Sequence, residues 1–302
     1  MSTNPKVSII FVNYFSEDDI KASIASIVEQ SIHSNFEILI VSNSTITQKN
    51  LSSLESKHHQ IRIFEQNENT GFAKACNFGA SKARGSFLFF LNPDTSFKNN
   101  VIDHLLEFQL AHPDAWIIGP KTLNPDKGTQ SATIKHDFNS VSLLALAFPL
   151  LKPLIPAEKK KDHFKVKQSM SVPIVNGHAL FVEKEIYKSL GGMDENFFMY
   201  YEENDLCLRT RKSGGKVYFC AKAELYHAKG STTSRYFVPM EIVKHQSKKK
   251  FLKKHYPSGI KWNRSAHIIG YIQRLLVALL IFKKNKIQQY YALLKWYLFS
   301  YQ

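Results

Sequence analysis

Residues 6–12 read Lys-Val-Ser-Ile-Ile-Phe-Val, a nearly continuous apolar run. Such a run is typical of a strand that a parallel sheet buries on both faces. A polar turn follows, and Ser16 with Asp19 three residues later has the spacing of a helix capping box. We therefore predict that a buried strand leads directly into a helix that ends at about Gln30.

The alternation of apolar runs and helical patterns continues to about residue 119. Expected strands cover Glu37–Val41, Ile61–Glu65, Phe87–Leu91 and Trp116–Gly119, and expected helices lie near Asn50–His58 and over Phe72–Ala83 and Asn99–Ala111. This spacing predicts βαβ units and an α/β fold with a doubly wound sheet. Ligands of such sheets bind where the strands end, so the candidate binding residues are Asn13, Tyr14, Ser42, Asn43 and the segments 67–71 and 92–94.

A later region departs from this rhythm. The segment Val141–Lys167 contains an apolar run, three prolines and a charged stretch. This composition predicts an insertion or mobile loop at about residues 141–170, between two halves of one catalytic domain that spans residues 1–235. A regular pattern then continues from Val172 to about His227.

The C-terminal part, residues 236–302, is basic and amphipathic. Residues 241–302 include thirteen Lys and Arg but a single acid, Glu241, and therefore carry most of the net charge of +15. The apolar segments Ala266–Phe282 and Ile287–Tyr301 are each shorter than the ~20 apolar residues that a spanning helix needs. Aromatic apolar faces with basic flanks predict helices that lie in the surface of an anionic membrane. Packing against the catalytic domain is the alternative.

The composition of the chain excludes some classes of protein. A chain of 302 residues with 44% hydrophobic residues can build a core, which excludes a wholly disordered protein. Cys76, Cys207 and Cys220 are scattered and lack the spacing of zinc ligands or of a disulfide framework. Residues 1–6 lead into the first strand without a secretion signal, so we expect the protein to act in the cytoplasm. The sequence indicates no oligomeric state.

Two sets of acidic residues could carry chemistry. Asp94 follows the expected strand Phe87–Leu91, and a carboxylate at that edge could hold Mg²⁺ or Mn²⁺, although Asn-Pro-Asp is also a common turn. Glu202 and Glu203 crowd the start of a helix, where they suit either a general base or an acidic cap.

Two further residues have simpler interpretations from the sequence. Asp205 and Arg209 stand four residues apart, which predicts an ion pair on one face of the helix. His227 follows the last strand-like segment and could be a metal ligand, a phosphate donor or a surface histidine.

Four motifs occur in a fixed order along the chain. They read Asn-Thr-Gly-Phe-Ala-Lys-Ala-Cys-Asn at 69–77, Phe-Phe-Leu-Asn-Pro-Asp-Thr at 89–95, Gly-Gly-Met-Asp-Glu-Asn-Phe-Phe-Met-Tyr-Tyr-Glu-Glu-Asn-Asp-Leu-Cys-Leu-Arg at 191–209 and His-Ala-Lys-Gly-Ser at 227–231. Together with the segments 119–121 and 126–131 they resemble glycosyltransferase family 2. Within it they are most similar to bacterial rhamnosyltransferases that build O-antigen, capsule or other cell-wall polysaccharide. The resemblance covers about Val7 to Ser231.

The resemblance implies a GT-A fold with a mixed sheet, inverting chemistry, a nucleoside-diphosphate sugar donor and a divalent metal, Mg²⁺ or Mn²⁺. By position, Asp94 matches the ligand of metal and diphosphate, His227 matches a second metal ligand, and Glu203 matches the catalytic base. The residues that match the donor side are Asn13, Tyr14, Ser42, Asn43, Asn69, Gly71, Asn77, Asn92 and Asp94. Those assigned to the acceptor side are Asn176, Gly177 and Glu202. Gly71 is expected to let the backbone approach the ligand closely.

The chain departs from the family pattern at three positions. Asn92 replaces the first acid of the metal motif, and Glu203 is one methylene longer than the aspartate that is usual at the base position. Ser42 stands where an aspartate commonly contacts the nucleotide. The resemblance makes dTDP-L-rhamnose the first-choice donor and a lipid-linked glycan or a polysaccharide the acceptor. The basic tail predicts peripheral attachment to the inner face of the cytoplasmic membrane, where a lipid-linked acceptor would be available. A UDP-sugar donor, or a catalytically impaired scaffold, is the alternative.

Other function classes fit less well. A dinucleotide oxidoreductase would place Gly-x-Gly-x-x-Gly after the first strand, and residues 12–18 contain no glycine. A nucleic-acid-binding protein would explain the basic tail but would leave the acidic motif and the strand-end motifs without a role. We therefore expect no nucleic-acid partner.

Overall fold

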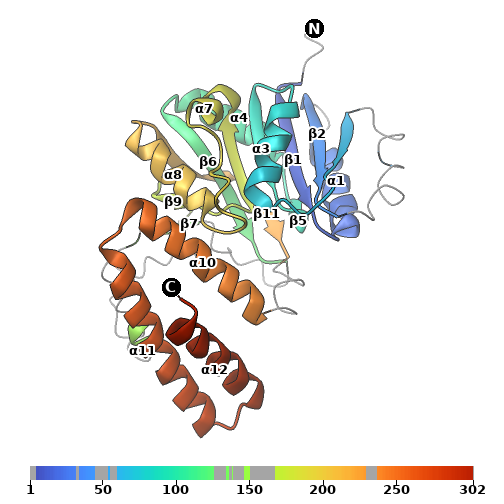
Figure 1. Cartoon of the computed structure of the whole chain (residues 1–302). Coiled ribbons are helices and arrows are strands. Elements are labelled where there is room, and N and C mark those ends of the chain that lie inside the picture. Colours follow the sequence, from blue (N-terminus) through green and yellow to red (C-terminus); the bar gives the residue numbers. More distant parts are fainter. Residues whose placement is uncertain are drawn as a thin grey trace. The chain divides into compact units, whose positions relative to one another are not determined.

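The computed structural model of the chain describes residues 5–31, 34–44, 54, 60–125, 134–135, 138, 146–149, 167–228 and 237–301. The chain forms two compact units, of which the first comprises residues 1–136 and 163–229 and the second comprises residues 137–162 and 230–302 (Figure 1).

The first unit is an α/β domain. Its strands are β1 (Val7–Asn13), β2 (Phe36–Ser42), β3 (Ile61–Glu65), β4 (Phe87–Leu91), β5 (Thr95–Phe97), β6 (Ala115–Leu123), β7 (Ile134–Lys135), β8 (Met170–Ser171), β9 (Ile174–Val175), β10 (Ala179–Glu183) and β11 (Lys216–His227). Its helices are α1 (Glu17–Gln30), α3 (Phe72–Lys82), α4 (Val101–Ala111), α7 (Lys184–Ser189) and α8 (Glu202–Lys212).

One large mixed sheet organises this unit. Its strand order is β3-β2-β1-β4-β10-β6-β11-β5, with β8 paired to β11, and β7 pairs with β9 in a separate small sheet. Strand β10 runs antiparallel to both β4 and β6, whereas β1 is parallel to β2 and β4. The start of β10 therefore lies at the same edge as the ends of β1, β2 and β4.

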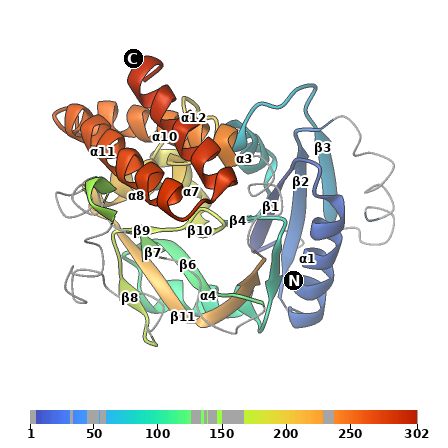
Figure 2. The same ribbon diagram turned by 90° about the horizontal axis from the view of Figure 1, so that it is seen from below.

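Helices cover both faces of the sheet (Figure 2). Alternate residues of β1 take part in two separate cores: Val7, Ile9 and Phe11 pack in the core that includes α1 and α4, and Ile10 packs in the core that includes α3, α7 and α8. This two-sided burial explains the continuous apolar run of the first strand. The predicted doubly wound mixed sheet is confirmed.

Some local predictions need correction. Ser16 precedes α1, but its side chain makes no capping hydrogen bond, so the expected capping box does not form. Instead the Ser16 amide donates to Asn13 Oδ1 at 3.0 Å and the Ser16 hydroxyl donates to the Tyr14 carbonyl. Asn13, at the end of β1, thus accepts from the Ser16 amide, the bond that Asp19 would have accepted in a capping box. The expected helix near residues 50–58 lies, except for Leu54, outside the described residues.

In the described part of the second unit, the long helices are α10 (Phe237–His255), α11 (Gly259–Leu280) and α12 (Lys284–Phe299). Their core is aromatic and is centred on Tyr271, Leu293, Tyr297 and Tyr301. The helical character predicted for residues 236–302 is confirmed. The sequence analysis did not delimit α10 as a separate helix, because the lysines that interrupt this segment obscure its helical periodicity. Among the described helices, none is both long and apolar enough to cross a membrane.

The segment expected as an insertion belongs partly to this second unit. Residues 137–162 group with the helices, and a Cβ placed on Gly259 would lie 2.7 Å from the ring of Phe138. Gly270 likewise packs closely on the Leu146 carbonyl. Most of the expected loop, residues 141–170, lies outside the described residues.

Candidate active site

Polar residues gather where β1 and β2 end. Asn13 pairs in register with Ser42, and both are fully buried. Asn13 Nδ2 lies 3.3 Å from Ser42 Oγ and 3.1 Å from Glu17 Oε1. The Ser42 hydroxyl donates to the Ser44 carbonyl at 3.0 Å. Tyr14, the next residue along, is 45% exposed, so this part of the edge combines a buried polar group with an accessible aromatic ring.

Asn43 connects this edge to the turn that precedes α3. Its Nδ2 donates to the Gly71 carbonyl at 3.1 Å, and its Oδ1 accepts from the Thr70 hydroxyl at 3.2 Å. Within the turn, Asn69 Oδ1 accepts from the Gly71 amide at 3.1 Å. The structure thus brings together Asn43, Asn69 and Gly71, all expected on the donor side.

Gly71 has a φ of +86°, a conformation that favours glycine. A Cβ at this position would lie 2.5 Å from the Phe198 carbonyl oxygen, which accepts a hydrogen bond from the Phe72 amide at 2.7 Å. The close approach expected for a ligand is therefore made by the chain itself. Glycine is required at this position because a side chain would prevent Phe198 from packing against the start of α3.

Asp94 and His227 meet at the end of β11. Strand β5 starts directly after Asp94, and its first residue, Thr95, pairs with His227. The His227 Nε2 lies 3.1 Å from Asp94 Oδ1, and the Ala228 amide donates to the Asp94 carbonyl at 2.9 Å. Both side chains are partly accessible, at 16% and 24%. Two residues that are far apart in the chain thus present one carboxylate and one imidazole together.

His178 lies beneath this pair. Its ring is 3% exposed and stacks on the His227 ring, with the ring centroids 4.4 Å apart and an angle of 8° between the planes. His178 Nε2 lies 2.6 Å from the Thr122 hydroxyl, and its carbonyl accepts from the Asn92 amide at 2.8 Å. The plane of the His227 ring is therefore held by the buried His178 ring, and His178 is itself fixed through both its side chain and its backbone.

The Asp94–His227 pair fits a divalent cation. Ligands at right angles around Mg²⁺, each at about 2.1 Å, are about 3 Å apart, which matches the separation of these two atoms. Burial raises the pKa of Asp19, and the nearby charges of Asp94 and then Asp18 raise it further, so negative charge accumulates here. Among the described residues no three His, Cys, Asp or Glu side chains converge as a complete metal site. Phosphate oxygens and water would have to supply the other ligands.

Glu202 and Glu203 begin α8 and are 4% and 3% exposed. The two residues before them, Tyr200 and Tyr201, have φ values of 69° and 72°. Left-handed backbone at two consecutive tyrosines costs of the order of 1–3 kcal/mol each, and such strain clusters at functional sites. The negative charge of Glu202, after burial, raises the pKa of the Cys76 thiol in α3. The two carboxylates are thus held in a buried, strained corner.

Gly177 contacts the side chain of Glu203. A Cβ on Gly177 would lie 3.3 Å from the Cβ, Cγ and Cδ atoms of Glu203. The next residue, His178, stacks on His227. Two consecutive residues therefore connect the candidate base with the candidate metal pair. Asn176, the other residue expected on the acceptor side, precedes them and is partly buried.

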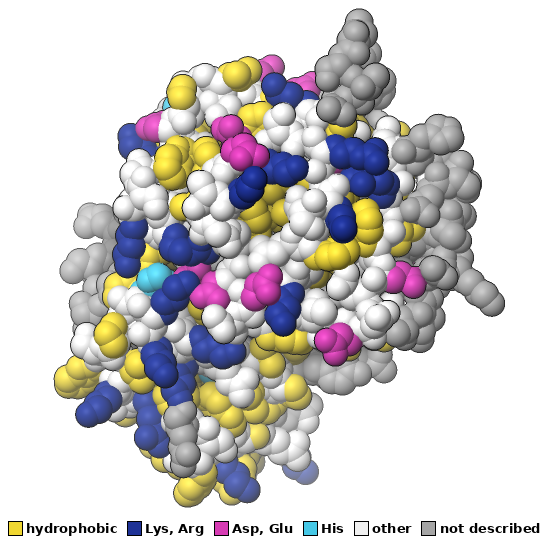
Figure 3. Space-filling model, turned by 45° about the horizontal axis from the view of Figure 1, so that its top comes forward, with side chains coloured by type: hydrophobic (Ala, Val, Ile, Leu, Met, Phe, Trp, Pro, Cys, Tyr) yellow, Lys and Arg dark blue, Asp and Glu magenta, His cyan; other side chains and the backbone are white. Residues whose placement is uncertain are grey.

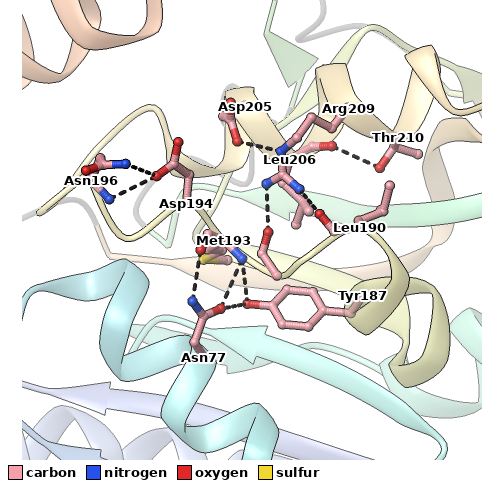
Figure 4. A network of polar contacts seen from close by, with 11 residues as sticks. Asn77, Tyr187, Leu190, Met193, Asp194, Asn196, Asp205, Leu206, Arg209 and Thr210 are labelled. Carbon is pink, nitrogen blue, oxygen red and sulfur yellow. Dashed lines mark hydrogen bonds and ion pairs between the residues drawn. The ribbon is translucent and has the colours of Figure 1, made fainter. Parts of the chain in front are cut away.

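Arg209 anchors α8 to the preceding loop (Figure 4). Its Nε donates to Asp205 Oδ2 at 2.7 Å, which confirms the predicted ion pair. Its guanidinium also donates to the carbonyls of Gly192, at 2.7 Å, and of Leu190. Because Asp205 is fully buried, this pair fixes the helix that carries Glu203.

Asn77 belongs to a neighbouring network (Figure 4). Its Nδ2 donates to the Met193 carbonyl at 2.8 Å and to Glu195 Oε1 at 2.9 Å, and its Oδ1 accepts from the Tyr187 hydroxyl at 2.5 Å. These bonds join α3 to the loop before α8. No contact among the described residues links Asn77 to the Asp94–His227 pair, so its expected donor role stays a prediction.

The sequence analysis missed His178. The rule for strand ends covers only residues that follow parallel strands, and the family resemblance pointed to Asn176 and Gly177 but not to His178. Strand β10 is antiparallel and presents its first residues at the same edge. A histidine directly before a short apolar strand was the available signal. The motif segments 126–131 and 229–231 lie outside the described residues.

Comparisons with known proteins show the family of the chain. The sequence profile described as Glycosyl transferase family 2 matches residues 8–189. A dTDP-rhamnosyl transferase of Shigella flexneri is 27% identical over 232 residues, which cover 75% of this chain and 70% of that protein. An N-acetylglucosaminyl-diphospho-decaprenol L-rhamnosyltransferase of Mycobacterium tuberculosis is 28% identical over 149 residues, or 48% of this chain and 47% of that protein. The chain spans 18% to 66% of the length of several other curated relatives.

A solved structure supports the fold. The mannosyltransferase of Pyrobaculum calidifontis, determined in complex with GDP-Man and Mn²⁺, superposes with a TM-score of 0.60 at 14% identity and covers 100% of this chain and 89% of its own. That likeness confirms the GT-A fold expected from the sequence. Because the profile covers more than half of the chain and the sheet has the expected mixed order, the chain belongs to glycosyl transferase family 2.

Proposed function

We propose that the protein is an inverting, metal-dependent hexosyltransferase that moves a sugar from a nucleoside-diphosphate donor to a lipid-linked glycan acceptor. The observation that carries this proposal is the segment Gly177–His178, which contacts Glu203 on one side and stacks on His227 on the other. A base for the acceptor and a pair of ligands for the donor diphosphate therefore share one site.

Glu203 is the residue that receives the acceptor proton. As the acceptor oxygen attacks the anomeric carbon, the bond from that carbon to the diphosphate oxygen breaks on the opposite side, and the proton passes to the carboxylate. A single in-line displacement of this kind inverts the configuration.

Asp94 and His227 are the residues that would hold Mg²⁺ or Mn²⁺. When bound, the ion supplies positive charge that stabilises the departing diphosphate. Asn13, Tyr14, Ser42, Asn43 and the turn at Asn69–Gly71 lie along the same edge and are proposed to bind the nucleotide. Asn92 joins this set through its backbone contact with His178.

The proposed donor of first choice is dTDP-L-rhamnose, and a UDP-sugar is the second choice. The Shigella flexneri relative is a dTDP-rhamnosyl transferase by name, and the name of the Mycobacterium tuberculosis relative specifies a decaprenol-linked acceptor. Ser42 is neutral, whereas this position is commonly an aspartate that contacts the nucleotide in the family. The identity of the donor nucleobase therefore has to be measured.

We propose that the second unit attaches the enzyme to the inner face of the cytoplasmic membrane. Its surface mixes Lys and Arg with apolar side chains (Figure 3), and residues 241–302 carry thirteen basic residues and one acid. Such a surface suits an anionic bilayer, at which a lipid-linked acceptor would be available.

The variant Glu203→Gln tests the assignment of the base. It keeps the size and hydrogen bonding of the side chain but cannot take a proton, so the transfer rate should drop by roughly 10²–10⁴ while donor affinity is retained. Glu202→Gln is the matched control and should have the smaller effect. A loss in Glu202→Gln with normal turnover in Glu203→Gln would assign the base to the preceding residue.

Calorimetry with a panel of dTDP-, UDP- and GDP-sugars, with and without Mn²⁺, tests the donor and the metal together. The wild-type chain should bind one donor class, and Mn²⁺ should strengthen that binding. Asp94→Ala should abolish the strengthening and leave the fold intact. If no nucleotide sugar binds in the presence of Mn²⁺, the chain is not an active transferase and the scaffold alternative stands.

A further inference from the structure

The second unit contains a pocket of about 270 Å³ at the junction of α11 and α12. Its lining combines three cationic side chains, Arg274, Lys283 and Lys286, with an apolar wall of Val277, Ala278 and Ile281. A cavity lined by both cations and aliphatic groups suits a ligand that has both an anionic group and an apolar body.

The cations of the pocket have no acidic partner among the described residues. Glu241, the single acid of residues 241–302, contacts Lys244 and His245 instead. Lys286 Nζ donates to the neutral Gln289 side chain at 3.1 Å. The described residues of this unit thus place no acidic side chain against the positive charges of the pocket.

The start of α12 adds to the positive potential. Lys283 caps this helix and Lys286 lies in its first turn, which contains no acidic residue. The N-terminus of a helix carries partial positive charge and normally attracts acidic side chains. Lysines at this end repel it and one another, and an anion bound between them would relieve that repulsion.

Large apolar side chains stand exposed beside the pocket. Leu276 is 56% exposed, Leu280 77% and Phe282 87%. These residues belong to the last turns of α11 and to the residues just after it, so they adjoin the lysines of α12. Exposed apolar side chains of this size, gathered near one end of a helix, favour an interaction surface.

We propose that this pocket binds the phosphate headgroup of an anionic membrane phospholipid, with the acyl chains against Leu276, Leu280 and Phe282. Arg274 would engage two phosphate oxygens, and Lys283 and Lys286 would act as point charges. The charge of the unit and the breadth of its apolar patch favour a bilayer lipid over a free anion. The inference rests on the proposed membrane attachment and assigns it to one specific site.

The full-length chain is tested with a soluble short-chain phosphatidylglycerol below its micelle concentration. The pocket variant is Lys283→Ala with Lys286→Ala, and the control is Lys261→Ala with Lys295→Ala, which removes the same charge from exposed positions of α11 and α12. The control should bind the lipid as the wild type does. The pocket variant should bind about 10-fold more weakly or worse, because charge-assisted hydrogen bonds are lost. Lys283→Arg with Lys286→Arg should restore binding.

Vesicles of phosphatidylcholine with and without phosphatidylglycerol provide the second readout. If the attraction is only diffuse, the affinity of each double variant for anionic vesicles should fall about 30-fold, since each lysine contributes about 1 kcal/mol. A greater loss for the pocket variant than for the control supports a specific site. Equal losses would overturn the proposal and leave only a diffuse basic surface.

Two competitors identify the source of the phosphate. Inorganic phosphate should not displace the short-chain lipid at equal concentration, and a polyprenyl phosphate should bind no more tightly than the phospholipid. Displacement by inorganic phosphate would make the pocket a free-anion site, and tighter binding of the polyprenyl phosphate would make it an acceptor site. Either result overturns the choice of a phospholipid. Donor binding is measured separately by calorimetry. Failure of the proposed transferase function can therefore be told apart from failure of the proposed lipid site.

Discussion

The buried ring of His178 limits where the His227 imidazole can lie. The two rings are almost parallel, and His178 is anchored by the Thr122 hydroxyl through its ring and by Asn92 through its backbone. A metal ligand whose plane is fixed before the ion binds loses less freedom on binding. Groups that orient the ligands of a metal change its affinity without touching the ion.

Replacing His178 by alanine should weaken Mn²⁺ binding about 10-fold, because His227 loses the ring that orients it. The amount of free Mn²⁺ in the presence of a nucleoside diphosphate, measured by electron paramagnetic resonance, gives this affinity independently of turnover. His178→Phe keeps a ring in the stack and should recover most of the loss. Wild-type Mn²⁺ affinity in His178→Ala would show that the stacking has no role in metal binding.

At the scale of elements, α8 depends on one arginine. Arg209 pairs with the fully buried Asp205 and donates to the carbonyls of Leu190 and Gly192. It therefore fixes the helix to the loop that precedes it, and Glu203 lies in the first turn of that helix.

Arg209→Ala should lower the free energy of unfolding by about 3–5 kcal/mol, because it takes the arginine charge away from a buried carboxylate. Urea unfolding measures this loss. The double variant Arg209→Ala with Asp205→Asn should be more stable than the single variant, since the buried charge is also removed. If the single variant is as stable as the wild type, the pair does not hold α8 in place.

The three helices of the second unit pack around histidines that stay neutral. Burial, together with the smaller effects of the Lys244, Lys248 and Arg274 charges, lowers the pKa of His245 from 6.5 to about 3. His245 also faces the Tyr271 hydroxyl, at 2.9 Å, and Glu241, at 3.7 Å. The net effect of these surroundings is to disfavour the protonated form.

His267 behaves in the same way. Burial, followed by the neighbouring charges, lowers its pKa far below the usual range. Its ring stacks on Tyr297, with the centroids 4.6 Å apart, and among the described residues neither ring nitrogen has a hydrogen-bond partner. The ring thus occupies a site that suits an apolar aromatic side chain.

The second unit should lose stability as the pH falls from about 6.5 toward 3. In that range the unfolded chain binds protons that the folded histidines do not, so the free energy of unfolding decreases by up to about 1.4 kcal/mol per pH unit for each histidine. His267→Phe should reduce this slope and stabilise the unit. Urea titrations followed by the fluorescence of Trp262 and Trp296 measure the effect, with His255→Phe as control. An unchanged slope in His267→Phe would contradict it.

At the scale of the whole molecule, charge is divided unevenly along the chain. Residues 241–302 hold thirteen of its 40 Lys and Arg but one of its 25 acids. High salt should weaken retention on anionic vesicles, since screening reduces the attraction between charges. It should not abolish retention, because the contacts of the apolar side chains with lipid are not screened.

The variant Leu280→Gln with Phe282→Gln should remove this salt-resistant part of the binding. Both side chains are at least 77% exposed, so their replacement leaves the helix core unchanged. Leu110→Gln, at a position 72% exposed on α4 of the first unit, is the control. Retention that stays equal in all three proteins at high salt would show that these side chains do not enter the bilayer.

Local sequence pattern was sufficient for most of the fold. The apolar run at residues 6–12 required a strand buried on both faces, and the structure has one between two helical layers. The spacing of Asp205 and Arg209 predicted their ion pair for a similar reason, because both lie on one turn of one helix. The candidate site residues at the ends of β1, β2 and β4 followed from the rule that parallel strands end at one edge.

The sequence by itself therefore determined the strands and helices up to about residue 119, the polar residues that follow those strands and the basic character of residues 241–302. Tertiary structure alone decided which distant residues meet. The pairing of β5 with β11 brings Asp94 to His227, the antiparallel direction of β10 brings His178 to the same edge, and the junction of α11 and α12 brings Arg274 to Lys283 and Lys286. Local periodicity reports which face of an element is buried, whereas strand order and helix packing depend on long-range contacts that no short stretch of sequence contains.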